Sequence, residues 1–210
     1  MVSLLVISLV GNVWLWREKN TLESQVEEVK VLGTIDGDTI VVGEKTRIRL
    51  RYIDAPEKDK CGYEEATKEL NKLTKDKTVR IAQVVPDQYG RGMAMVYLDG
   101  KSINELMLAT GWVRYHSDIT SDREEMKAAA QKAEDEKLGV YGKCQSKTNL
   151  KNTKCVIKGN IDFAINKKTY HLPGCAQYES TMVQEDKGEA WFCTESEARK
   201  AGYEKSQRCK

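Results

Sequence analysis

The sequence predicts an α+β protein in which five strands and three helices form a small, partly open Greek-key β-barrel, followed by a smaller αβ unit. Two observations lead to this prediction. Strand-like segments of alternating or β-branched character are interleaved with amphipathic segments, and a polar stretch at residues 145–154 divides the chain. With 210 residues, 40% of them hydrophobic, the chain is long enough for one full core and a smaller one.

The expected strands of the barrel cover residues 29–35, 39–42, 46–53, 78–85 and 93–98. Residues 39–42 are apolar and β-branched, and residues 43–45 have turn chemistry, so these strands form a hairpin with residues 46–53. Alternation along the second arm of the hairpin separates arginines from apolar residues. It places Arg47, Arg49 and Arg51 on one face and Ile48, Leu50 and Tyr52 on the other.

The expected helices cover residues 63–75, 102–110 and 122–137, the last with Ala129, Ala133 and Leu138 facing inward. Residues 145–154 have almost nothing to bury and are expected to be a linker. In the second unit, residues 155–161 and 170–175 are expected to be extended on either side of a turn. Thr194 and Glu197 form a capping box that opens a short helix.

The N-terminal residues 1–16 are almost wholly apolar and indicate a signal or membrane-anchor segment, followed by a polar stalk at residues 17–27. The segment is shorter than the roughly 20 residues that a spanning helix prefers. It also has no basic leader, which suggests that the true start lies upstream of Met1, and cleavage of the segment is left open. A buried core helix is the alternative.

The net charge of +2 excludes a strongly basic nucleic-acid protein, so any electrostatic footprint must be a local patch that includes Arg47, Arg49, Arg51 and Arg91. The chain has six cysteines and no Cys-x-x-Cys pair, which favours disulfides and an oxidising compartment over buried reduced thiols. We therefore expect the protein to be secreted or membrane-anchored through residues 1–16, with the remainder extracellular and monomeric.

A candidate metal site lies at one end of the predicted hairpin. Asp38 opens its first strand and Asp54 follows its second, so folding brings both carboxylates to the same end, and Pro56 turns the chain so that Glu57 approaches them. Calcium accepts irregular sets of carboxylates, carbonyls and water. Asp38, Asp54, the carbonyl of Ala55 and a water held by Glu57 would make such a set. A simple Asp-Gly-Asp turn beside a solvated arginine face is the alternative.

The order and spacing of several short motifs resemble the staphylococcal nuclease (thermonuclease) family. They are Asp36-Gly37-Asp38-Thr39, Arg49-Leu50, Asp54-Ala55-Pro56-Glu57, Asp87-Gln88-Tyr89-Gly90-Arg91-Gly92, Asn104-Glu105 and Gly111-Trp112. The resemblance covers residues 28–144 and implies an OB-fold. It also implies an extracellular calcium-dependent nuclease of the endonuclease type that hydrolyses DNA and RNA. Residues 155–210 resemble a small cysteine-containing module found on secreted nucleases.

Phosphodiester hydrolysis requires a nucleophilic water, charge stabilisation at phosphorus and help for the leaving group. The resemblance implies that Arg49, Glu57 and Arg91 are the catalytic residues, with Glu57 either a base or a group that positions water. Arginine forks suit phosphate oxygens. Tyr89 and Tyr115 are expected to contact a nucleotide, and both histidines are interpreted as structural. The alternative function is a non-catalytic OB-fold module that binds nucleic acid or protein at the cell surface.

The positions of the cysteines suggest three pairs. Cys61 lies in the loop beside the candidate site, and Cys144 follows the third helix, so a bond between them would tie both to the barrel. In the second unit the suggested pairs are Cys155 with Cys193 and Cys175 with Cys209. A zinc site is the alternative there, with His171, Cys175, Cys193 and Cys209 as ligands.

Overall fold

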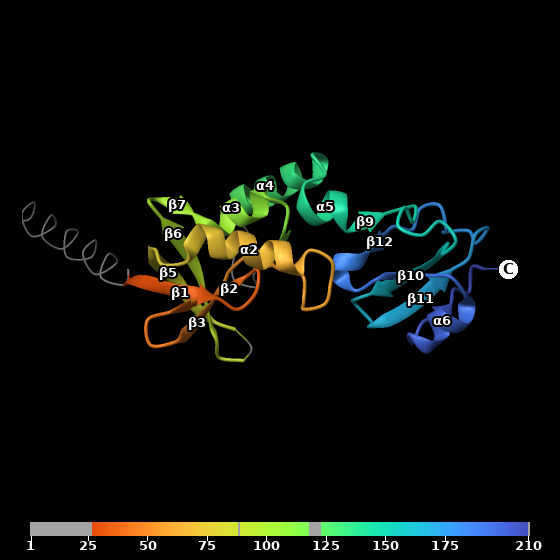
Figure 1. Ribbon diagram of the computed structural model, residues 1–210, viewed down its shortest axis with the longest axis horizontal. Helices are drawn as coiled ribbons and strands as arrows, with labels where there is room; N and C mark the ends of the chain where they lie inside the picture. Colours follow the sequence, from red (N-terminus) through yellow and green to blue (C-terminus); the bar gives the residue numbers. More distant parts are fainter. Residues whose placement is uncertain (1–26, 88, 118–122, 210) are drawn as a thin grey trace, which may run out of the picture.

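The computed structural model describes residues 27–87, 89–117 and 123–209. Figure 1 shows two lobes side by side, the larger built from β1 to β7 with α2 to α5 and the smaller containing β10, β11 and α6. The predicted signal or anchor segment, residues 1–16, lies outside the described residues, as does the predicted stalk except for residue 27. Across the described ranges, none of the helices has the length and apolar character needed to cross a membrane.

The larger lobe is a barrel closed by a single parallel strand pair. Its sheet has the order β3-β2-β1-β5-β6-β7, and β3 pairs additionally with β6 in parallel, so β1, β2, β3, β5 and β6 form a closed five-stranded barrel. This confirms the predicted α+β barrel. The bounds are β1 Glu27–Thr34, β2 Thr39–Val42, β3 Thr46–Leu50, β5 Thr78–Pro86, β6 Gly92–Leu98 and β7 Lys101–Ser102. The short strands β4 (Ile53–Asp54) and β8 (Arg114–Tyr115) form a separate antiparallel pair.

The helices of the larger lobe are α2 (Tyr63–Thr74), α3 (Ile103–Ala109), α4 (Glu124–Asp135) and α5 (Gly139–Lys143). The prediction that one helix covers residues 122–137 with Leu138 facing inward needs correction. Lys137 has a left-handed φ of 55°, which separates α4 from α5, and Leu138 is 37% exposed. The buried face of α4 consists of Met126, Ala130 and Ala133.

The barrel core consists of the apolar faces of the strands together with buried residues of α2 and α3. Asn104, which is fully buried at the start of α3, accepts the N–H of Val96 at 2.9 Å and donates to the carbonyls of Arg51 and Ala94 at 2.9 and 3.1 Å. A buried amide with all of these bonds satisfied fixes one helix position against two strand segments. It therefore holds the end of the β3 strand in place.

The smaller lobe has a sheet of order β13-β10-β11-β14 and one short helix. Its elements are β10 Ile157–Asp162, β11 Lys167–His171, β13 Ala190–Phe192, β14 Glu204–Lys205, the 3-10 helix η1 Glu185–Lys187 and α6 Glu195–Lys200. The predicted N-cap is present, since the Thr194 hydroxyl accepts the N–H of Glu197 at 3.2 Å. The Glu197 carboxylate accepts the N–H of Cys193, the residue before the cap, at 2.9 Å, whereas in a capping box it would accept that of Thr194.

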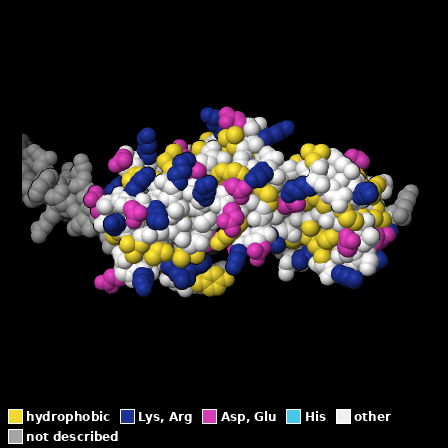
Figure 2. All heavy atoms as spheres, viewed as in Figure 1, with side chains coloured by type: hydrophobic (Ala, Val, Ile, Leu, Met, Phe, Trp, Pro, Cys, Tyr) yellow, Lys and Arg dark blue, Asp and Glu magenta, His cyan; other side chains and the backbone are white. Residues whose placement is uncertain are grey.

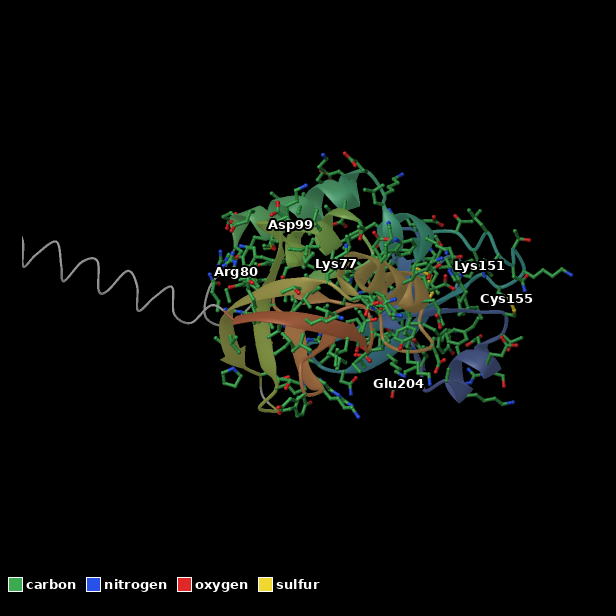
Figure 3. All side chains as sticks on the ribbon, turned by 60° about the vertical axis from the view of Figure 1, so that its left-hand side comes forward. Lys77, Arg80, Asp99, Lys151, Cys155 and Glu204 are labelled. Atoms are coloured by element: carbon green, nitrogen blue, oxygen red, sulfur yellow. A yellow bond between two sulfur atoms is a disulfide. The ribbon has the colours of Figure 1, made fainter. Side chains whose placement is uncertain are left out.

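Residues 145–154, expected to be a linker, are mostly exposed, but two parts of the segment contact the rest of the chain. Strand β9 (Gln145–Ser146) pairs with β12 (Val183–Gln184), and the buried Asn149 donates to the carbonyl of Cys155 at 3.0 Å. The returning chain at β12 supplies backbone partners that composition alone does not reveal. Lys151 and Cys155 lie at the end of the molecule opposite Arg80 (Figure 3).

Three disulfides link the cysteines in the pairs expected: Cys61 with Cys144, Cys155 with Cys193 and Cys175 with Cys209. No free cysteine is found, and all six positions lie in the described ranges. Cysteine sulfurs bonded to each other are not zinc ligands, so the alternative zinc site is excluded in this structure. The Cys61–Cys144 bond ties the loop after β4 to the end of α5.

Candidate active site

Asp38, Arg49 and Asp54 meet at one end of the β2–β3 hairpin. Thr39 is the register partner of Arg49, so the preceding residue, Asp38, lies directly beside the arginine. Nη2 of Arg49 lies 2.8 Å from Oδ2 of Asp38 and 2.8 Å from Oδ1 of Asp54. Two carboxylate oxygens therefore converge on a single nitrogen, as the hairpin geometry predicted for the two aspartates.

Asp38 is the most buried member of this group, with 2% of its surface exposed. Oδ2 accepts the N–H of Ala55 at 3.1 Å, and Oδ1 accepts the hydroxyl of Thr39 at 2.8 Å. Burial raises the pKa of Asp38 to about 7, since desolvation disfavours the carboxylate, while the charge of Arg49 opposes this rise and that of Asp36 adds to it. The site thus holds a carboxylate whose charge requires a nearby cation.

Glu57 and Ala55 lie at the edge of a cleft of about 430 Å³ that also contains Asp54. Glu57 is exposed in the turn after Pro56, where the Lys60 N–H donates to the Glu57 carbonyl at 3.0 Å. Its side chain is accessible to solvent and to a bound molecule. Ala55 is 9% exposed, and its N–H is committed to Asp38.

Arg51 does not belong to the arginine face that the sequence predicted. Tyr52 has a left-handed φ of 64°, β3 ends at Leu50, and the strand alternation stops there. Arg51 is 5% exposed and donates to the carbonyl of Gln83 at 3.1 Å and to the hydroxyl of Tyr52 at 3.0 Å. Its guanidinium therefore hydrogen-bonds within the barrel. Arg49 is the arginine that lies beside the two aspartates.

Arg91 and Tyr89 lie in the turn between β5 and β6. Arg91 precedes Gly92, whose parallel partner is Ile48, so Arg91 enters the sheet beside the strand that carries Arg49. Its Nε donates to Asp87 at 2.6 Å, and its guanidinium lies 5.2 Å from the centre of the Tyr89 ring. Tyr89 is 74% exposed. Within the described residues, Arg91 contacts its own turn and not the carboxylates of Asp38 and Asp54.

Tyr115 lies on β8 opposite Ile53, next to the Asp54 end of β4, and is half-buried. Its neighbour His116, which the sequence led us to interpret as structural, is exposed and lines the same cleft as Glu57. Arg114, the register partner of Asp54, also lines the cleft. Sequence reasoning missed His116 and Arg114 because neither stands in a motif, and only the β4–β8 pairing brings them to Asp54.

The donor set fits a hard divalent cation. Asp38 and Asp54 present carboxylate oxygens at one point, now compensated by Arg49, and calcium accepts further carbonyl or water ligands. Among residues 27–87, 89–117 and 123–209, no group of three or more His, Cys, Asp or Glu side chains is gathered tightly enough to hold a metal by itself. Carbonyl or water oxygens would therefore have to complete the set, as expected for Ala55 and for a water at Glu57.

The fold is a five-stranded barrel of OB-fold type, and Arg49 lies between two aspartates at the open end of the β2–β3 hairpin. Both features agree with the OB-fold nuclease that the motifs resemble. The family model described as staphylococcal nuclease homologue matches residues 47–143. This part of the chain is therefore similar to the staphylococcal nuclease family, in agreement with the resemblance seen in the motifs.

Relatives in bacteria and plants align with about half of the chain. The chain is 34% identical over 110 residues to an uncharacterized endonuclease of Haemophilus influenzae and 38% identical over 97 residues to one of Escherichia coli O157:H7, covering 50% and 42% of this chain. A staphylococcal-like nuclease of Arabidopsis thaliana is 32% identical over 101 residues, 48% of this chain. The alignments span 58%, 63% and 31% of the length of these three relatives.

Proposed function

We propose that the protein is a calcium-dependent nuclease that hydrolyses phosphodiester bonds of DNA and RNA outside the cell. The proposal rests on one observation. Asp38 and Asp54 both contact Arg49 at the edge of a cleft that also contains Glu57. The endonuclease and nuclease names of the relatives support it.

Arg49 is the residue proposed to bind the phosphate. Nη2 makes the ion pairs with both aspartates, so its other N–H donors remain available to phosphate oxygens. A planar guanidinium offers two parallel N–H donors to the phosphate oxygens. These donors bind the phosphorane more strongly than the ground-state phosphate, because negative charge develops on its oxygens. The aspartates fix the orientation of Arg49 before substrate arrives.

Glu57 is proposed to accept a proton from the attacking water or to position that water. Its exposed side chain lines the same cleft as Asp54, and a carboxylate there can accept a proton or a hydrogen bond from water. Arg91 is proposed to add a second positive charge from the neighbouring strand, after exchanging Asp87 for a phosphate oxygen. Tyr89 and Tyr115 are proposed to contact the nucleotide.

Asp38, Asp54 and the carbonyl of Ala55 would hold the calcium ion, which when bound supplies positive charge to polarise the phosphate. Three disulfides support an oxidising, extracytoplasmic location. Residues 1–16 are proposed to target or anchor the chain to a membrane, with the two lobes acting as a monomer outside it.

A cleavage assay on single-stranded DNA and on RNA, with calcium or with excess chelator, tests the proposal. Wild-type protein should cleave only with calcium. Arg49→Lys should lower kcat by about 100-fold, because the charge remains while the fork is lost.

Arg80→Lys is the matched control, since Arg80 lies on β5 with its guanidinium over the ring of Tyr97 at 4.2 Å and should leave activity unchanged. Undiminished cleavage in chelator would refute the metal assignment. Nucleic-acid binding with no cleavage under either condition would favour the non-catalytic binding module instead.

A further inference from the structure

The cleft beside Glu57 is formed by both lobes. One wall consists of Asp54, Ala55 and Glu57 from the nuclease domain, and the other includes Phe163 and Lys187 from the smaller lobe. Phe163 follows β10, and Lys187 ends η1. These residues are more than 100 positions from Glu57 in the sequence, and neither belongs to any motif of the nuclease family.

The smaller lobe is held against the nuclease domain by a buried ion pair. Arg114 on β8 donates from Nε to Oδ2 of Asp186 at 2.6 Å and from Nη2 to Oδ1 at 3.1 Å, with side-chain exposures of 15% and 3%. The N–H of Glu185 donates to the carbonyl of Cys144 at 2.8 Å. Because Arg114 is also the register partner of Asp54, the position of η1 is fixed directly relative to the candidate site.

The loop between β4 and α2 approaches the smaller lobe (Figure 1), and it borders the same cleft. A Cβ atom placed on Gly188 would lie 3.1 Å from Nζ of Lys60, so this lysine rests against the smaller lobe. Lys60 also lines the cleft, and the adjacent Cys61 is anchored to Cys144. Lys60 from the nuclease domain and Lys187 from the smaller lobe thus line the same groove.

Phe163 is an aromatic side chain that folding leaves uncovered. It is 58% exposed although it lines the cleft, and Nζ of Lys187 lies 5.9 Å from the centre of its ring. An exposed ring beside an ammonium group offers a face for a nucleobase and a charge for the adjoining phosphate.

The charges of the groove suit a polyanion. Arg114 is neutralised by Asp186 and Asp54 is paired with Arg49, so Lys60 and Lys187 face Glu57 as the remaining full charges of the cleft lining. Figure 2 shows Lys and Arg side chains interspersed with Asp and Glu over one face of both lobes. On this face, a local groove rather than a broad basic surface is therefore where nucleic acid can be attracted.

We infer that the smaller lobe supplies a second nucleic-acid subsite, in which a base of a single strand stacks on Phe163 while Lys187 and Lys60 bind the flanking phosphates. This inference rests on the proposed nuclease function, and it extends the substrate beyond the nucleotide at Asp38 and Arg49. It assigns a role in substrate binding to the C-terminal part of the chain.

Two measurements on full-length protein test the inference. The first is binding of a fluorescent oligothymidylate of about 20 nucleotides in chelator, followed by anisotropy over a range of salt concentrations. The second is cleavage, in calcium, of that oligonucleotide and of a mononucleotide ester, thymidine 5′-(p-nitrophenyl phosphate). The variants are Phe163→Ala and Lys187→Gln. The control is Ile165→Ala, which removes a side chain that is 67% exposed in the same turn and does not line the cleft.

Phe163→Ala should weaken oligonucleotide binding about tenfold and raise KM for the oligonucleotide similarly, because stacking of one base is lost. Lys187→Gln should reduce the slope of log K against log salt by about 0.7, the value for one phosphate contact in a single strand. Both variants should cleave the mononucleotide ester like wild type, and Ile165→Ala should match wild type throughout.

Equal binding by Phe163→Ala and Ile165→Ala would overturn the inference, whatever the cleavage rates. Failure of the wild-type protein to bind the oligonucleotide would overturn it as well. If the expected pattern of binding is found but wild type cleaves neither substrate, the nuclease proposal fails while the subsite stands.

Discussion

Replacing Asp186 with Asn should loosen the contact between the two lobes. The change leaves Arg114 charged and largely buried, with side-chain exposure of 15%. It removes the negative charge and replaces one of the two oxygens that accept at 2.6 and 3.1 Å by an NH2 group that cannot accept. Burial alone lowers the pKa of Arg114, yet the hydrogen bond and charge of Asp186 raise it above its ordinary value. Asp186 therefore supplies the main compensation for this cation.

Breaking one partner of a buried pair costs about 3–5 kcal/mol of folding free energy. Arg114 keeps a bond to Gln145 at 3.2 Å and a contact with the ring of Tyr141 at 4.7 Å, so we expect a loss near the lower limit, about 3 kcal/mol. Urea unfolding followed by circular dichroism and tryptophan fluorescence measures it. Arg114 is also the strand register partner of Asp54, so this contact sets the position of the smaller lobe relative to the candidate site. The same variant should therefore raise KM for long substrates more than for a mononucleotide ester.

Lys151→Met provides the matched control. It removes a neighbouring ion pair, Lys151 with Glu185 at 2.6 Å, whose side chains are 68% and 29% exposed. Such exposed pairs contribute about 0–1 kcal/mol. Our reasoning about the lobe contact would be refuted if Asp186→Asn unfolded within about 0.5 kcal/mol of wild type, or if the two variants lost equal stability.

Three further outcomes are expected. In calcium titrations of activity, Asp38→Asn should shift the midpoint to higher calcium, whereas Glu57→Gln should lower kcat at an unchanged midpoint; identical midpoints would contradict this division of roles. Burial raises the pKa of Glu189, so the folded state retains a proton that the unfolded state has lost, and this residue's contribution to stability falls as pH rises above its ordinary value of 4.5. Glu189→Gln should flatten that part of the stability–pH profile measured by urea unfolding, and an unaltered profile would argue against it. Replacing Cys61 and Cys144 together with Ala opens a link with a sequence separation of 83 and should cost about 4 kcal/mol, so unchanged thermal unfolding would show that the bond does not stabilise the fold.

Local sequence patterns were sufficient for most elements of the structure. Strand alternation predicted the hairpin that carries Asp38 and Arg49, and helical periodicity predicted α2 at Tyr63–Thr74. The Thr194 side chain caps the helix as expected. These features depend on residues a few positions apart, whose backbone preferences and side-chain geometry act in the same way in any fold.

Other expectations failed where a single backbone angle or a distant partner decided the outcome. Arg51 was assigned to the arginine face by alternation, but the left-handed turn at Tyr52 ended the strand and directed the guanidinium to Gln83. The pattern at residues 145–154 indicated a linker and did not reveal that its first two residues, Gln145 and Ser146, pair with β12. A periodic pattern carries no information about where it stops or about which remote backbone supplies its hydrogen bonds.

The sequence by itself determined the barrel, the family resemblance and the acidic and arginine residues beside one another in the hairpin. Only the tertiary structure placed Phe163 and Lys187 in the cleft with Glu57, through the Arg114–Asp186 pair that joins the lobes. The physical reason is that hairpin contacts are fixed by short-range pairing, whereas contacts between segments more than 100 residues apart depend on how two separately built surfaces match in shape and charge.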